Sequence, residues 1–195
     1  YLEGLRTTIY VTLGSLIFSL ILSIPLAMIK ITKNKILNFI GFLYTDIFRA
    51  LPSLVQIYLV YFAAPQLFGI TFTAMTSAFI TLSMNAAAYI SEALRGGILS
   101  VDIGQREAAK ALGISQVDTL KDIVLPQALK AVFPSMINET IGLLKGTSLV
   151  SIIGVVDLMR ASRQVMADSY LSFEPLMVAA VIYYILVKSM SMIGN

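Results

Sequence analysis

The sequence contains no cysteine, no histidine and no tryptophan. Without cysteine, the chain can form neither a disulfide framework nor a thiolate metal site. Without histidine, it lacks the commonest general base and metal ligand. Charged residues are also scarce: they make up 13% of the 195 residues, whereas a soluble domain has about 25%. The composition therefore points away from a catalytic or metal site and away from a soluble domain.

Apolar residues make up 57% of the chain, against about 45–50% in soluble proteins. We therefore predict an all-α membrane protein whose helices contact lipid. The formal net charge of +3 is too small, and the basic residues are too scattered, to indicate a nucleic-acid partner. The first apolar run is too long for a signal peptide. Because the chain opens on Tyr1 and stops inside an apolar run, we expect it to be part of a longer protein.

The charge-poor runs predict five transmembrane helices in one bundle, since about 20 apolar residues cross a bilayer. They are residues 7–29, two runs on either side of a break at 64–70, residues 126–145 and residues 173–193. The run before the break is apolar from Ile36 onwards, so the second helix is expected to be long and bent near Pro52. The run after the break predicts a third helix from about Thr73 to Leu94.

The loop between the first two predicted helices sets the topology. It carries Lys30, Lys33 and Lys35 and no acidic residue. By the positive-inside rule this loop is cytoplasmic. The N-terminus is then outside, and the C-terminus is inside after five crossings. The mixed, amphipathic stretch of residues 147–173 should accordingly lie outside.

Some polar residues within the predicted helices have a structural explanation. Glu92 and Arg95 are three residues apart and are expected to pair at the cytosolic end of the third helix. Asp46 and Arg49 have the same spacing and can pair near the cytosolic end of the second helix. A stripe of serines on the first helix suits close helix packing, and its members are Ser15, Ser19 and Ser23.

The density of charged residues rises sharply between residues 95 and 122. The motif with the most specific spacing in the chain begins in this segment. Glu107-Ala108-Ala109 is followed after three residues by Gly113, and after nine more by Ile123-Val124-Leu125-Pro126. Residues 107–112 are strong helix formers, and Gly113 can end their helix in a left-handed cap. A second helix then opens over residues 115–124 and turns back toward the membrane. Pro126 suits the first turn of the fourth transmembrane helix.

This spacing is similar at every position to the EAA loop of ABC importer permeases, E-A-A-x3-G-x9-I-x-L-P. Three further segments resemble motifs of the polar amino-acid uptake permeases within that group. They are Phe48-Arg49-Ala50-Leu51-Pro52 with Gln56, similar to F-R-G-x-P-x-x-x-Q; residues 85–97 with 100–105; and residues 144–149, similar to L-K-[DN]-T-S-L. The likeness covers essentially the whole chain. It implies that residues 1–195 are a single transmembrane domain of a type I ABC importer, with a coupling loop at about 102–126.

The resemblance also implies partners and a location. In the bacterial cytoplasmic membrane, this chain and a second copy or a close paralogue would enclose the pathway of a polar amino acid. An extracellular binding protein, or a binding domain fused upstream, would deliver that amino acid. A separate P-loop ATPase subunit would dock on the coupling loop, where the implied contacts are Glu107, Ala108, Ala109, Leu112 and Gly113. Without the resemblance, the same loop would be interpreted as a solvated hairpin between two spans.

The chain itself is expected neither to bind ATP nor to be an enzyme. Residues 142–148 superficially resemble a Walker A loop, which needs Gly-Lys-Ser/Thr in succession. Here Gly146 separates Lys145 from Thr147. We therefore assign ATP and its magnesium to the partner subunit, and no cofactor or metal to this chain.

Glu139 is the clearest candidate for a substrate-binding residue. It lies 13 residues past Pro126, about 20 Å along a helix, and a charge at that depth usually faces a cavity or a partner. The other members of its helix face are Ser135, Gly142 and Gly146. Thr81 and Asn85 form a comparable stripe on the third helix. We predict that both faces line the pathway, although Asn85 could equally join helices and Glu139 could be a structural, hydrogen-bonded glutamate.

One departure from the family segment favours one kind of substrate over another. Gly146 stands where the family segment commonly has Asp or Asn, so the predicted site loses a second polar group. A single carboxylate favours glutamine, or glutamate, over arginine or lysine.

Two other classes of protein remain open. A secondary transporter usually has inverted repeats, which we do not find. An intramembrane enzyme would need a nucleophile–base pair, which the chain lacks. Among ABC importers, a permease for metal, sulfate or opines is the nearer alternative.

Overall fold

The computed structural model describes residues 1–193, and every regular element within that range is a helix. The elements are α1 (Leu2–Ile31), α2 (Lys35–Ala50), α3 (Ser53–Tyr58), η1 (Leu59–Ala63), α4 (Ala64–Phe68), α5 (Ala74–Ser100), α6 (Ile103–Ala111), α7 (Gln116–Asp118), η2 (Thr119–Val124), α8 (Leu125–Gly146), η3 (Thr147–Ile153), α9 (Leu158–Ser169) and α10 (Phe173–Ile193). Of these, η1 and η2 are π-helices and η3 is a 3-10 helix. The prediction of an all-α protein is confirmed.

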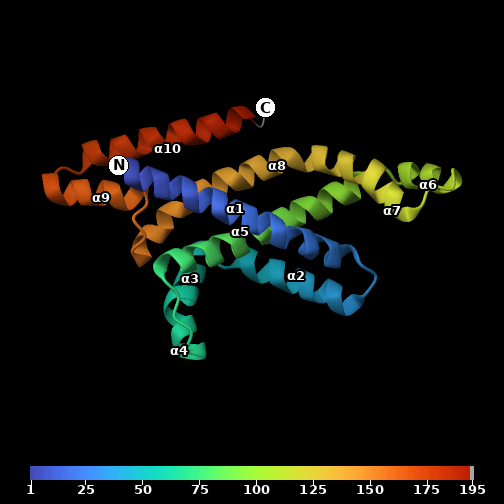
Figure 1. The fold of residues 1–195 in the computed structure, drawn as a ribbon, viewed down its shortest axis with the longest axis horizontal. Helices are drawn as coiled ribbons and strands as arrows, with labels where there is room; N and C mark the ends of the chain where they lie inside the picture. The colour runs from blue at the N-terminus through green and yellow to red at the C-terminus, as the bar shows by residue number, and fades with distance from the viewer. Residues whose placement is uncertain (194–195) are drawn as a thin grey trace.

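Helix α5 forms the centre of the bundle, with α1, α2 and α8 packed around it. Figure 1 shows α1, α5 and α8 running along the long axis of the molecule, with α10 beside α8. One end of the bundle holds α6, α7 and the loop between α1 and α2, whereas the N-terminus and α9 lie at the other end. The serine stripe of α1 is fully buried, as the predicted close packing requires.

Helices α5 and α8 approach each other closely at Gly97. A Cβ atom at this position would collide with the side chain of Val132 and would lie 3.0 Å from the carbonyl oxygen of Ala128. Because that oxygen belongs to the backbone of α8, it cannot swing aside as the end of a side chain can. The absence of a side chain at Gly97 therefore fixes the separation of two helices that carry predicted site residues.

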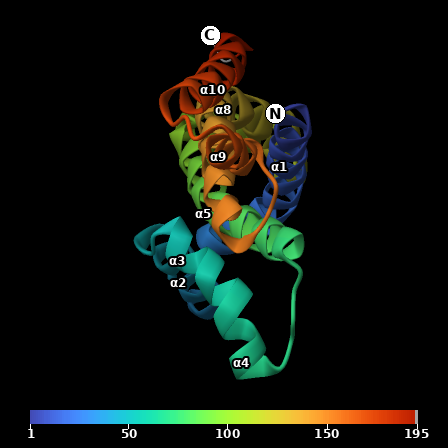
Figure 2. The ribbon, with the colours of Figure 1, turned by 90° about the vertical axis from the view of Figure 1, so that its left-hand side faces the viewer.

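The second predicted helix is broken sharply. Helix α2 ends at Ala50, where Pro52 disfavours a helical conformation of Leu51, which is extended instead (φ −86°, ψ 135°). The chain resumes at Ser53, and α3, η1 and α4 continue as one arm bent by 105° from α2. Figure 2 shows this arm projecting from the side of the bundle. A bend near Pro52 was expected, but its angle was not, because proline marks a break without setting its direction.

Each π-helix ends two residues before a proline: η1 before Pro65 and η2 before Pro126. A proline cannot donate the hydrogen bond of an ordinary helical turn, and its ring crowds the carbonyl group four residues earlier. The wider π turn accommodates both effects. As a result α7, η2 and α8 follow one another without interruption over residues 116–146, and α8 continues directly from the coupling loop.

By length and composition, α1 and α10 are each able to cross a membrane, judged over residues 1–193. Two bent pairs qualify as well if each is one span: α2 with its arm, and residues 116–153 with α9. Helix α5 is long, at 27 residues, but less apolar than α1. Its burial among other helices explains why it needs less apolar surface. The number of spans and their direction stay predictions.

One of the three lysines assigned to the first loop does not lie there. Lys30 is in the last turn of α1, and its side chain is fully buried. Its ammonium group donates hydrogen bonds of 2.8 Å to Ser91 Oγ and Glu92 Oε1. Arg95 holds the other oxygen of Glu92 at 2.9 Å, which confirms the predicted Glu92–Arg95 pair. Assigning Lys30 to the loop was wrong, because a count of basic residues near a helix end takes no account of burial.

Candidate functional site

Two side-chain amides hold the break between α2 and α3. The buried amide of Gln56 donates hydrogen bonds of 2.8 Å to the carbonyl oxygens of Phe48 and Leu51. These carbonyls lie at the end of α2, where backbone groups have no helical partner. Asn85 of α5 donates to the Phe48 carbonyl and to Gln56 Oε1, at 3.2 Å each. Asn85 thus makes the helix-joining contacts that we considered for it, and its contact with a substrate stays a prediction.

Arg49, one residue before the end of α2, lies against α5. The centre of its guanidinium group is 5.4 Å from the centroid of the Tyr89 ring, within the range of a cation–π contact. Asp46, Arg49, Ala50 and Tyr89 line a cavity of about 350 Å³. Arg49 is 14 residues from the start of α2, about 21 Å along the helix. A positive charge and an aromatic ring therefore border a hollow next to the break between α2 and α3.

Glu139 of α8 is half-buried, and it forms no ion pair among the described residues 1–193. The bundle thus carries a half-buried carboxylate on α8 and, beside an aromatic ring of α5, a guanidinium group from α2. An amino acid carries a carboxylate and an ammonium group, and charge-assisted hydrogen bonds to both need such a pair. Sequence reasoning proposed Glu139 as a binding residue, which stays a prediction, and did not propose Arg49 or Tyr89 for that role. A charge within an apolar run was the signal that could have found Arg49.

The other predicted site residues lie on the same helices, but not all in one cavity. Thr81 is buried one turn from Asn85, and its hydroxyl has no hydrogen-bond partner among residues 1–193. Ser135 lines a separate cavity of about 350 Å³ between α5 and α8. Gly146 packs toward α5, where a Cβ would lie 3.4 Å from Leu82 Cδ2.

The coupling loop has the predicted cap at Gly113. Its φ of +74° is left-handed, a conformation that favours glycine. The N–H group of Gly113 donates to the Lys110 carbonyl at 3.1 Å, and that of Ile114 donates to the Ala109 carbonyl at 3.0 Å. This pair of hydrogen bonds is the Schellman motif, which ends α6 and turns the chain toward α7. The left-handed cap is confirmed.

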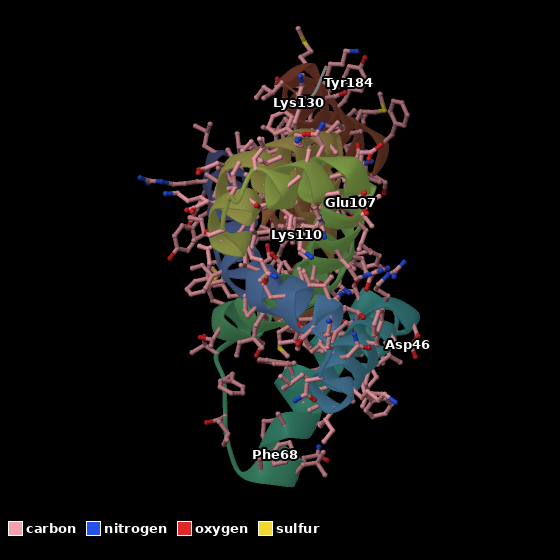
Figure 3. The ribbon with its side chains drawn as sticks, turned by 90° about the vertical axis from the view of Figure 1, so that its right-hand side faces the viewer. Asp46, Phe68, Glu107, Lys110, Lys130 and Tyr184 are labelled. Atoms are coloured by element: carbon pink, nitrogen blue, oxygen red, sulfur yellow. The ribbon has the colours of Figure 1, made fainter. Side chains whose placement is uncertain are left out.

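The predicted coupling residues divide into a buried and an exposed set. Ala109 is buried, on a helix that packs against η2. Glu107, Ala108 and Leu112 are exposed, and the side chain of Leu112 is 79% accessible. Figure 3, viewed toward the α6 end, shows Glu107 and Lys110 on the end face of the bundle. The loop thus presents charged and apolar side chains together on a capped helix, which suits contact with another protein.

Comparisons with known proteins agree over nearly the whole chain. A family model described as "Binding-protein-dependent transport system inner membrane component" matches residues 9–194. A putative glutamine transport system permease protein GlnP of Rickettsia bellii is 44% identical over 99% of this chain and 88% of its own length. The arginine transport system permease protein ArtQ of Bacillus subtilis is 42% identical over 100% of this chain and 89% of its own. A crystal structure of an amino acid ABC transporter with histidines superposes with a TM-score of 0.93 at 32% identity, covering 99% of this chain and 90% of the other.

Proposed function

The chain belongs to the family of binding-protein-dependent transport system inner membrane components, and on that premise we propose that it is the permease of an ATP-driven importer of polar amino acids. Two relatives are named for glutamine and arginine transport, and a third is an amino acid ABC transporter of known structure. In such a system the permease is a transport component and not an enzyme. ATP and magnesium belong to the partner ATPase.

The observation that supports the proposal is the cavity of about 350 Å³ at which Arg49 lies over the ring of Tyr89, while Glu139 is half-buried on α8. Arg49 would hold the carboxylate of the substrate in a bidentate contact. Glu139 would accept hydrogen bonds from its ammonium group. One charge of each sign matches a zwitterion with a neutral side chain, so glutamine is favoured over arginine. Asn85, Thr81, Ser135 and Gly146 would shape the surrounding pathway.

The transport cycle would join this site to the coupling loop. Five spans, with the N-terminus outside and the C-terminus inside, would pair with a second copy or paralogue around the pathway. The exposed side chains of Glu107, Ala108 and Leu112 would dock on the ATPase, while Gly113 keeps α6 in place. A loaded binding protein and ATP would then bias the same two-state element from opposite ends.

Uptake by the reconstituted complex tests the proposal. The permease, its ATPase subunits and its binding protein are placed in liposomes, and uptake of labelled glutamine and arginine is followed with ATP inside. Glu139→Gln is expected to lower glutamine uptake at least tenfold, since an amide cannot neutralise an ammonium group. Lys130→Gln, an exposed change on the same helix, is the matched control and should leave uptake unchanged. Arginine uptake tenfold above that of glutamine would overturn the substrate assignment, and uptake without the ATPase subunit would overturn the importer.

A further inference from the structure

Helix α2 carries two opposite charges on an exposed, otherwise apolar face. Asp46 and Arg49 follow Phe39 and Phe42 at helical spacing, and all four side chains are exposed in the single chain. Figure 3 shows Asp46 at the outer side of the bundle. A charge at mid-helix in a membrane costs about 2.5–3.5 kcal/mol on insertion scales unless it meets water or a partner. Lipid therefore cannot be the only neighbour of this face.

Neither Asp46 nor Arg49 has an ion-pair partner among the described residues of its own chain. Glu92, the nearby acid on α5, already has one oxygen bound to Lys30 and the other to Arg95. Asp46 and Arg49 instead border two hollows together, of about 380 and 350 Å³. The expected pairing within α2 is thus not formed, and space for a further group remains beside both side chains.

We propose that α2 meets α2 of a second copy of this chain, and that Asp46 of each copy pairs with Arg49 of the other. The inference rests on the proposed function, which requires two permease chains around one pathway. In a two-fold contact, a residue that touches its counterpart is touched in return, so one contact supplies the missing opposite charge to all four groups. The two residues differ by about 4.5 Å in height along the helix, which the long arginine side chain can span.

This pairing would complete the substrate site from outside the chain. Arg49 is exposed and contacts the ring of Tyr89, so a carboxylate from the second copy would fix the guanidinium group beside that ring. Each site would then be fully ordered only in the assembled pair. Substrate binding and assembly would share one residue.

Cysteine cross-linking tests the contact directly, because the natural chain has no cysteine. Two differently tagged versions, Asp46→Cys and Arg49→Cys, are expressed together with the ATPase subunits and treated in membranes with a short bis-maleimide. The cross-linked mixed dimer should exceed several-fold that of the control pair Leu13→Cys and Ile17→Cys, two exposed positions on α1. A yield no higher than that of the control overturns the proposal.

Charge reversal in trans separates this pairing from one within α2. Asp46→Arg alone and Arg49→Asp alone place like charges opposite each other in their own dimers. Expressed together under two tags, they restore two attractive pairs across the contact but none within either chain. Mixed dimers should therefore exceed the share expected from random assembly, and random assembly would overturn the proposal. Neither assay needs transport, so the ion pair can fail while glutamine uptake stands, or hold while uptake fails.

Discussion

Replacing Gly113 by alanine should weaken the coupling of ATP hydrolysis to uptake. The residue has φ +74°, and a Cβ built there meets no atom within 4 Å. The substitution therefore adds no clash, and its whole cost is that of a left-handed L-residue, about 1–2 kcal/mol. A cost of that size lowers the ratio of capped to uncapped loop by about 5–30-fold. The loop that carries Glu107 and Leu112 then loses its fixed orientation.

The assay measures uptake and ATP hydrolysis stimulated by the loaded binding protein, in the reconstituted complex. Gly96→Ala is the matched control, since a Cβ there also meets no atom within 4 Å and the backbone is α-helical. This variant should keep both activities, and alanine within a helix is even stabilising by about 0.5–1 kcal/mol. Gly113→Asn should fall between the two, because asparagine visits the left-handed region more readily than alanine.

Two results would refute this reasoning. Full coupling in Gly113→Ala would mean that contacts with the ATPase, and not the Schellman motif, hold α6 in place. An equal loss in Gly96→Ala would mean that the assay reports general stability of the bundle.

Two further substitutions probe the groups that hold the site. Gln56→Leu leaves the Leu51 carbonyl without its side-chain donor and the Phe48 carbonyl with Asn85 alone, at about 1–3 kcal/mol for a group that stays dry, so the melting temperature should fall. Gln127→Leu, an exposed change, should leave the melting temperature unaltered. Lys30→Met removes one of the two cations that bind Glu92. Because Arg95 remains, the free energy of unfolding should fall by less than the about 3–5 kcal/mol typical of a broken buried pair. Denaturant unfolding in detergent measures this change. A fall in unfolding free energy equal to that caused by Glu92→Met would contradict the shared role of Arg95.

Local features of the fold were accessible from the sequence because each depends on a few adjacent residues. The left-handed cap at Gly113 follows from one glycine after a run of helix formers. The buried serine stripe of α1 follows from a four-residue repeat. The 105° break after Ala50 could not be foreseen, because its direction depends on Gln56 and on Asn85, which lies 29 residues further along the chain.

For a similar reason, only part of the candidate site could be predicted from the sequence. Glu139 stands out because no opposite charge lies at helical spacing along its own helix face. Arg49 has Asp46 three residues away, and that spacing offered a local partner that the structure does not use. Tyr89 gave no signal, since an aromatic residue in a membrane helix contacts lipid or neighbouring helices in most cases. Each of these features depends on packing between residues that are far apart in the sequence. The spacing of residues along one helix does not encode such packing.

The charged groups around Glu92 and those around Arg49 differ in how much of their hydrogen-bonding capacity is used within the chain. In the first, both oxygens of Glu92 are occupied by Lys30 and Arg95, and the Lys30 side chain is sealed from solvent. Such a cluster joins α1 to α5 and has no capacity left for a ligand. In the second, Arg49 lies over an aromatic face and forms no ion pair among residues 1–193, and a cavity lies beside it. A buried charge whose hydrogen-bonding capacity is filled stabilises packing, whereas an exposed charge whose capacity is left open, next to an empty volume, can exchange partners as a substrate passes.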